Sequence, residues 1–299
     1  MRFTAIIVGL FCFVTSVANA ATLTQLTTGS SYHFEPRFSP TQDVIIYAGG
    51  DLYTIPSSGG GSSLFLNTGM SNYSPCYFPD GVKVVFNGQG PGELFVYDGV
   101  SSFTQITFNG ARNDDPYVSP DGQWIYFVHD KFGASVIMRI HPDGTGQQTV
   151  VTVGQPNSPS VSPDGTTLYY SANSSGSYQI WRANTDGTNS AQVTPEDGHH
   201  RYCAVQSPTA PLLAYSGEGG GPLPVDRYGI FTCGLNGQQD TNQLVPLMPG
   251  THPSWSRNGD MITFQGVVGG EYHVFLLTNL ELPVPARTTS WGQLKAHYR

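Results

Sequence analysis

The most constraining feature of this sequence is a recurring unit, Pro-x-x-Ser-Pro-Asp-Gly followed by an apolar run. The unit is best formed at residues 116–122 and 159–165. Its anchor, the residue before the turn, recurs after 39, 41, 43, 45 and 49 residues, at Ser39, Phe78, Ser119, Ser162, Ser207 and Ser256. A period of about 40–45 residues is typical of a four-stranded propeller blade. The sequence therefore predicts an all-β fold, a six-bladed β-propeller.

Each unit contains the signals for four strands. A second apolar run follows the first turn, then a Gly-rich link, a third strand, a second turn and a fourth strand. The second turn carries Asx-Gly pairs, such as Asp98-Gly99 and Asp143-Gly144, which supply the positive φ that tight hairpins need. Charged residues make up only 11% of the chain, whereas Gly (36) and Pro (22) are abundant, which favours many short strands over helices.

The two ends of the repeat array complement each other. The sixth unit lacks a fourth strand after Leu277, and residues 23–27 resemble residues 103–107, the fourth strand of the second unit. We therefore expect the N-terminal strand to supply the outer strand of the last blade and to close the ring. An open β-solenoid, the alternative, would leave residues 23–27 without a role.

The termini differ from the repeats. Arg2, the apolar residues 5–17 and the Ala-Asn-Ala at 18–20 are typical of a secretory signal peptide, and this run is too short to span a membrane. We thus expect a signal peptide at 1–20, a propeller at 21–280 and a C-terminal tail at 281–299, with a periplasmic or secreted location and no membrane span. The tail is interpreted either as a loose packing segment or as a short docking segment.

Charge and cysteine content exclude some classes of protein. The formal net charge of −8 argues against nucleic acid as a partner. Beyond the predicted signal peptide the cysteines are Cys76, Cys203 and Cys233, too few for a disulfide framework and without the Cys-x-x-Cys spacing of zinc sites. One disulfide plus a free thiol, or three buried thiols, would both fit this number.

The repeat resembles a known family. Its Pro-x-x-Ser-Pro-Asp-Gly turn, apolar strand, aromatic-containing strand and Asp-Gly turn are similar to the TolB-type, WD-like propeller repeat over residues 23–277. The resemblance implies a six-bladed propeller that is exported in bacteria and binds proteins or peptides at its ring face and central channel. We expect no counterpart of the N-terminal α/β domain of TolB proper. Similar repeats occur in oligogalacturonide-lyase-like propellers.

No catalytic pattern stands out in the sequence. Neither a Gly-x-Ser-x-Gly elbow nor a His-Glu-x-x-His motif is present, so no catalytic residue is assigned. The turn carboxylates Asp80, Asp121 and Asp164 recur on separate blades, and we expect them to accept hydrogen bonds from local backbone N–H groups.

The candidate site lies at the other end of the same strands. In related propellers the first strand of each blade lines the channel, so the residues at the position before the repeat proline should surround its mouth: Glu35, Ser74, Asp115, Ser158, Cys203 and His252. The predicted ligand-binding residues are Glu35, Asp115, His200, Arg201 and His252. Any divalent metal would use Glu35, Asp115, His200 and His252.

Two functions and a neutral alternative follow from this surface. The first is a non-enzymatic scaffold that binds a protein or peptide through the channel mouth and loops and needs no cofactor. The second is a metal-assisted carbohydrate lyase or hydrolase that works in the channel. The neutral alternative is a purely structural envelope protein whose channel mouth is solvated and has no dedicated ligand.

Overall fold

The computed structural model describes residues 21–29, 32–88, 92–173, 176–218, 228–238, 242–244 and 249–280. Within these ranges the chain forms 24 β-strands and no helix. The described residues accordingly contain no helix that could cross a membrane. The predicted signal peptide (1–20) and tail (281–299) lie outside the described residues.

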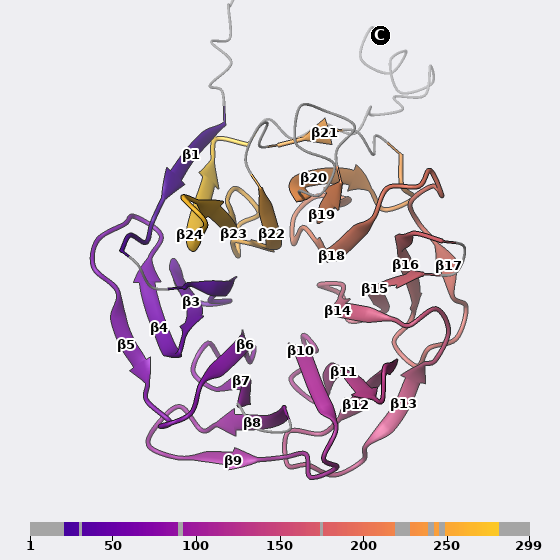
Figure 1. The fold of residues 1–299 in the computed structure, drawn as a ribbon, viewed down its shortest axis with the longest axis horizontal. Helices are drawn as coiled ribbons and strands as arrows, with labels where there is room; N and C mark the ends of the chain where they lie inside the picture. The colour runs from indigo at the N-terminus through magenta and orange to yellow at the C-terminus, as the bar shows by residue number, and fades with distance from the viewer. Residues whose placement is uncertain are drawn as a thin grey trace, which may run out of the picture.

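The strands form six antiparallel sheets of four strands each, arranged around a central axis (Figure 1). This arrangement confirms the predicted six-bladed propeller. The innermost strand of each blade faces the channel; these strands are β2 (Phe34–Phe38), β6 (Asn72–Tyr77), β10 (Arg112–Val118), β14 (Asn157–Val161), β18 (Arg201–Gln206) and β22 (Gly250–Trp255).

The remaining strands follow outward in chain order. The second strands are β3 (Val44–Gly49), β7 (Val84–Gly88), β11 (Ile125–Lys131), β15 (Thr167–Asn173), β19 (Leu212–Glu218) and β23 (Ile262–Val268). The third strands are β4 (Asp51–Pro56), β8 (Glu93–Tyr97), β12 (Ala134–Ile140), β16 (Tyr178–Asn184), β20 (Tyr228–Gly234) and β24 (Glu271–Thr278). The outer strands are β5 (Ser63–Leu66), β9 (Phe103–Gln105), β13 (Gln148–Val151), β17 (Ala191–Gln192), β21 (Asn242–Gln243) and β1 (Thr22–Gln25).

The N-terminal strand closes the ring, as predicted. Strand β1 pairs antiparallel with β24 and completes the sheet β1-β24-β23-β22 (Figure 1). Just beyond β1, the backbone N–H of Leu26 donates to the carbonyl of Val274 at 2.8 Å, and the Leu26 side chain joins an apolar cluster with Val274 and Leu276. The first and last segments of the propeller thus share one blade.

Apolar contacts between neighbouring blades form the core. One cluster combines Val85 and Leu94 of the second blade with Ile125 and Phe127 of the third, all of them fully buried. Burying a side chain of this size contributes about 1.5–3 kcal/mol. Strands β7 and β11 are therefore covered on both faces, which explains their continuous apolar sequence.

The Asp-Gly turns have the local role that the sequence predicts. The Asp164 carboxylate accepts hydrogen bonds from the Ser162 hydroxyl (2.5 Å) and the Thr166 backbone N–H (3.0 Å), and Gly165 has a φ of +74°. The bond from Ser162, with those from Thr166, lowers the pKa of Asp164 below its usual value. Asp80 and Asp121 accept the equivalent backbone bonds from Val82 and Gln123.

The three described cysteines form no disulfide with one another, which excludes the disulfide alternative, but only two of the three are buried. Cys76 and Cys233 are buried between strands. Cys203 is half-buried and lies at the channel mouth, where it belongs to the candidate site.

Candidate functional site

Every innermost strand contains a bulge at the same position of the repeat. The strand pairing shifts register there in all six blades, for example between Asp114 and Tyr117. The bulged residue has a left-handed backbone in each blade: Glu35 (φ 51°), Ser74 (49°), Asp115 (49°), Ser158 (49°), Cys203 (55°) and His252 (54°). Non-glycine residues seldom adopt this conformation. These six residues, here called the mouth ring, are those predicted to surround the channel.

Hydrogen bonds join neighbouring members of the mouth ring. The Glu35 carboxylate accepts from the backbone N–H (2.5 Å) and the hydroxyl (2.7 Å) of Ser74. The Ser158 hydroxyl donates to Asp115 at 3.2 Å, and the Cys203 thiol donates to Ser158 at 3.4 Å. The ring is therefore a connected polar layer contributed by separate blades.

Three members of the mouth ring could bind a metal ion together. One ligating atom from each of Glu35, Asp115 and His252 lies within 4.8 Å of the other two. His252 Nε2 is 3.9 Å from a Glu35 carboxylate oxygen, and the two side chains are 22% and 19% exposed, so solvent reaches both. Two carboxylates and one imidazole suit a divalent cation such as Mn²⁺.

The clustered charges alter one another's ionisation. Burial, with the adjacent carboxylates of Asp114 and Glu35, raises the pKa of Asp115 to about 6. Burial alone would lower the pKa of His252, but Cys203, Glu35 and Asp115 raise it above its usual value. The acidic neighbours therefore favour the protonated form of His252, while burial favours the neutral form of Asp115.

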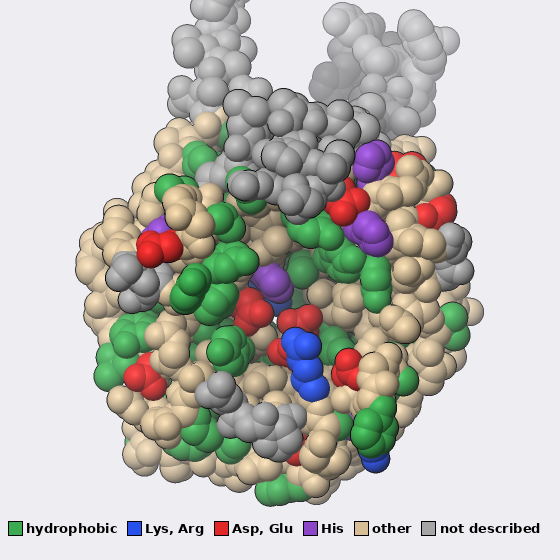
Figure 2. Space-filling view, in the orientation of Figure 1, with side chains coloured by type: hydrophobic (Ala, Val, Ile, Leu, Met, Phe, Trp, Pro, Cys, Tyr) green, Lys and Arg blue, Asp and Glu red, His purple; other side chains and the backbone are tan. Residues whose placement is uncertain are grey.

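Aromatic side chains flank this polar centre in two groups, here called the aromatic walls. The first wall, from the first, second and sixth blades, contains Tyr32, Phe34, Tyr73 and Tyr272, with ring centroids 5.3–6.1 Å apart. The second contains Tyr178, Tyr202 and Tyr228, with adjacent centroids 4.9 and 5.5 Å apart. Figure 2 shows acidic, histidine and basic side chains together in the centre of this face, with apolar side chains around them.

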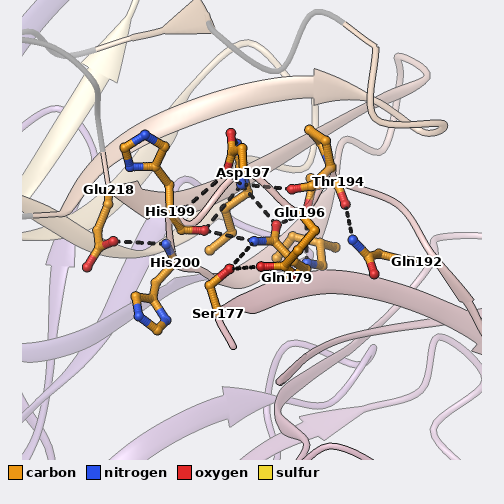
Figure 3. A network of polar contacts seen from close by, with 12 residues as sticks. Ser177, Gln179, Gln192, Thr194, Glu196, Asp197, His199, His200 and Glu218 are labelled. Atoms are coloured by element: carbon orange, nitrogen blue, oxygen red, sulfur yellow. Dashed lines mark hydrogen bonds and ion pairs between the residues drawn. The ribbon is translucent and has the colours of Figure 1, made fainter. Parts of the chain in front are cut away.

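His200 and Arg201 lie outside the Glu35–Asp115–His252 cluster. Arg201 is buried, and its guanidinium donates to Gln179 (2.9 Å) and to both carboxylate oxygens of Asp197 (2.9 and 2.8 Å). Figure 3 shows Gln179, Thr194 and Asp197 in this network. His200 accepts from the Tyr178 backbone N–H at 3.1 Å, and its ring points away from Gln179. His200 therefore packs against the second aromatic wall, whereas Arg201 links the fifth blade to the fourth beside it.

Position within the repeat explains the place of Arg201. In several blades the residue two positions before the mouth-ring residue is buried and forms a hydrogen bond with the preceding blade. The His33 ring nitrogen lies 3.2 Å from the Tyr272 carbonyl oxygen, and the Asn113 side chain donates to Glu93 at 2.9 Å. Arg201 occupies this same position. Aligning the blades residue by residue would have separated this structural role from the ring.

The aromatic walls were not predicted from the sequence. Three of their members, Phe34, Tyr73 and Tyr202, come directly before a mouth-ring residue. The sequence signal that could have indicated the aromatic walls is an aromatic residue directly before the mouth-ring residue in three of the six blades.

Comparison with known proteins agrees with this architecture. A family model, the TolB beta propeller domain, matches residues 49–209, more than half of the chain. The chain belongs to the TolB beta-propeller family. An uncharacterized member of the proteome of Agrobacterium fabrum, Atu1656, is 30% identical over 113 residues, which cover 36% of this chain and only 38% of that relative.

Solved structures share the propeller fold. A protein assigned as TolB from Agrobacterium tumefaciens superposes with a TM-score of 0.71 at 17% identity, covering 89% of this chain and 98% of that one. An oligogalacturonate lyase in complex with manganese gives a TM-score of 0.57 at 20% identity, covering 86% and 80%. At identities this low the similarity shows a shared fold alone. The function of this TolB-family chain must therefore be inferred from the residues of its own site.

Proposed function

We propose that this TolB-family chain is an exported, non-enzymatic propeller that binds a protein or peptide at its channel mouth. The observation that carries the proposal is the combination of ring carboxylates with aromatic walls on one face. Polar groups that converge inside an apolar surround are the usual form of a binding site. The TolB resemblance, which implies partner binding at the ring face and channel, supports the same surface.

The charges of the mouth indicate what the partner presents. Asp114, next to the ring, is already paired with Arg112, and the His252 imidazolium offsets only one of the two ring carboxylates. A lysine or arginine side chain could therefore bind Glu35 and Asp115 while its stem packs on the walls. We infer that the partner inserts a basic residue of an extended segment.

Peptide selection tests this proposal. A phage-displayed random peptide library is selected on the immobilised protein, and the strongest binder is synthesised for titration calorimetry. We expect selected peptides to be enriched in lysine and arginine, and Glu35→Gln to weaken binding about tenfold or more because it removes a charge-assisted bond.

A matched control removes a carboxylate elsewhere. Asp80→Asn keeps the acceptor oxygen for Val82 and Lys83 and removes one negative charge at the opposite end of the channel. This variant should bind the peptide as the wild type does. Equal weakening in both variants, or selected peptides without basic residues, would contradict the proposal.

A second candidate function is metal-assisted chemistry on a carbohydrate. It is favoured by the Glu35–Asp115–His252 cluster, whose donor atoms suit a divalent ion. Once His252 has lost its proton, those three side chains would hold the ion, which when bound would act as a Lewis acid on a substrate oxygen. The aromatic walls would then pack against the sugar rings.

Calorimetric titration with Mn²⁺ after chelator treatment tests the second candidate. Stoichiometric binding that is lost in His252→Ala but kept in His200→Ala is expected, because His200 lies outside the cluster. Absence of Mn²⁺ binding by the wild type would rule the metal-assisted function out.

Export is also part of the proposal. The signal-like sequence at residues 1–20 supports it. Intact-mass measurement of the protein from a periplasmic or medium fraction should give a chain that starts near Ala21. A cell-associated chain that keeps residues 1–20 would contradict export.

A further inference from the structure

A second candidate binding site lies at the opposite end of the channel. There the innermost strands and the turns after them enclose a cavity of about 380 Å³. Five blades contribute to its rim the proline that follows the repeat anchor, namely Pro40, Pro79, Pro120, Pro163 and Pro208, and the sixth contributes Arg257. The mouth-ring residues do not line this cavity, so it is separate from the site of the proposed function.

Arg37 is the unusual residue of this cavity. Two positions after the mouth ring, the other blades have Cys76, Tyr117, Ser160, Val205 and Ser254, whereas the first blade has a guanidinium. Arg37 is half-buried and lies over the Tyr117 ring, 5.6 Å from its centroid. Its guanidinium forms no hydrogen bond or ion pair with the residues in the described ranges, although its backbone pairs with β3.

The cavity supplies Arg37 with no counter-ion. None of the described lining residues is Asp or Glu, in a chain whose formal net charge is −8. Burial raises the pKa of the Cys76 thiol, and it raises the pKa of Tyr117 to about 12, so both are neutral at physiological pH. Asp115 is near enough for Arg37 to influence its pKa but forms no ion pair with it.

Arg257, the second cation of the lining, is already satisfied. Its guanidinium lies 3.2 Å from an Asp43 carboxylate oxygen and donates to the Thr41 carbonyl at 3.0 Å. The N–H groups of Arg37 are not among the buried atoms without a partner, so they contact solvent, but they have no protein acceptor of this kind among the described residues. Arg37 therefore lacks a partner that a bound anion would provide.

The rest of the lining defines the shape of that anion. Beside Arg37, the wall consists chiefly of apolar and aromatic side chains, among them Tyr117, Val161 and Trp255. We propose that this cavity binds a small organic carboxylate with an apolar body, whose carboxylate pairs with Arg37 in the bidentate manner that guanidinium favours. The apolar body would pack against the aromatic side chains.

Three isosteric probes test the proposal by calorimetry: phenylacetate, phenylacetamide and 2-phenylethylamine. Wild-type protein should bind phenylacetate about tenfold or more tightly than the neutral amide, and the amine least of all. Arg37→Gln should abolish the preference for the carboxylate while leaving weak amide binding unchanged. Arg257→Gln, a matched loss of a cation at the rim, should keep the preference.

Two further measurements make the outcome decisive. Inorganic phosphate should bind at least tenfold more weakly than phenylacetate, because it does not use the apolar wall. If Arg37→Gln does not fold, Arg37→Lys keeps the charge but loses the planar fork, and it should reduce the carboxylate preference in part. Equal binding of carboxylate and amide by the wild type, or an unchanged preference in the folded Arg37 variants, would overturn the proposal.

Discussion

At the residue scale, the left-handed bulge determines where the site lies. A non-glycine residue in this conformation costs on the order of 1–3 kcal/mol, so six of them persist only because the surrounding structure holds them. The Glu35 N–H donates to Gln265 at 3.0 Å and the His252 N–H donates to Ser216 at 3.1 Å. These contacts from neighbouring blades stabilise the bulges that place the mouth-ring side chains.

Substitutions at Ser158 test this strain. Glycine and valine both remove the Ser158 hydroxyl, but only valine is hindered at a φ of 49°. We expect Ser158→Val to have a free energy of unfolding about 1–3 kcal/mol lower than Ser158→Gly. At Ser135, on strand β12 with ordinary strand geometry, the order should reverse, because valine favours strands and glycine does not. Urea unfolding of the four variants measures both differences; the same order at both sites would contradict the strained bulge.

The Arg201–Asp197 pair predicts a pH dependence of stability. Hydrogen bonds from Arg201 lower the pKa of Asp197 to about 2, below the value of about 3.9 in an unfolded chain. The pair therefore stabilises the fold above pH 4, and this contribution is lost as the pH falls from about 4 to about 2. Urea unfolding should show Asp197→Asn less stable than the wild type at pH 6, with the gap closing near pH 2. A gap that stays constant over this range would exclude the depressed pKa.

The same residues show how far the sequence predicts the site. The proline of the repeat marks the position of Glu35, Asp115 and His252, so a periodic alignment finds the mouth ring. It does not reveal the bulge, because Glu, Ser, Asp, Cys and His share no sequence preference for a left-handed backbone. The alignment also separates His200 and Arg201 from the ring, but it does not show that Arg201 is buried in a hydrogen-bond network with the preceding blade.

At the element scale, the shared blade of β1 and β24 closes the molecule. The sequence predicts this closure because residues 23–27 match a fourth strand that the sixth repeat lacks. Among the other outer strands, β17 and β21 each have only two residues, because a strand at the outer edge of a blade has a partner on one side only.

Two leucines of the N-terminal segment give a matched test of closure. Leu26 is only 9% exposed and packs on Val274 and Leu276, whereas Leu23 is 40% exposed. We expect Leu26→Ala to lower the free energy of unfolding by about 2–4 kcal/mol and Leu23→Ala by less than about 1 kcal/mol. Similar values for the two variants in urea unfolding would show that closure contributes little stability.

At the scale of the whole molecule, the channel has two chemically different ends. The mouth ring presents carboxylates between aromatic walls, whereas the opposite cavity presents the unpaired guanidinium of Arg37. Both ends lie on the same six strands, so the propeller presents two candidate binding sites of opposite charge without any change of fold. This difference in charge arises because positions two residues apart on an innermost strand lie at opposite ends of the channel. In the first blade these positions hold Glu35 at the mouth and Arg37 in the cavity.

The proposed function requires that a basic side chain of the partner contacts the carboxylates of the mouth ring. Zero-length carbodiimide crosslinking of the selected lysine peptide, followed by mass-spectrometric mapping, tests it most directly because it joins only an amine and a carboxylate in contact. Crosslinks are expected from the peptide lysine to Glu35 or Asp115, and they should be lost when that lysine is replaced by norleucine. Crosslinks confined to carboxylates at the opposite end, such as Asp43 or Asp80, would contradict it.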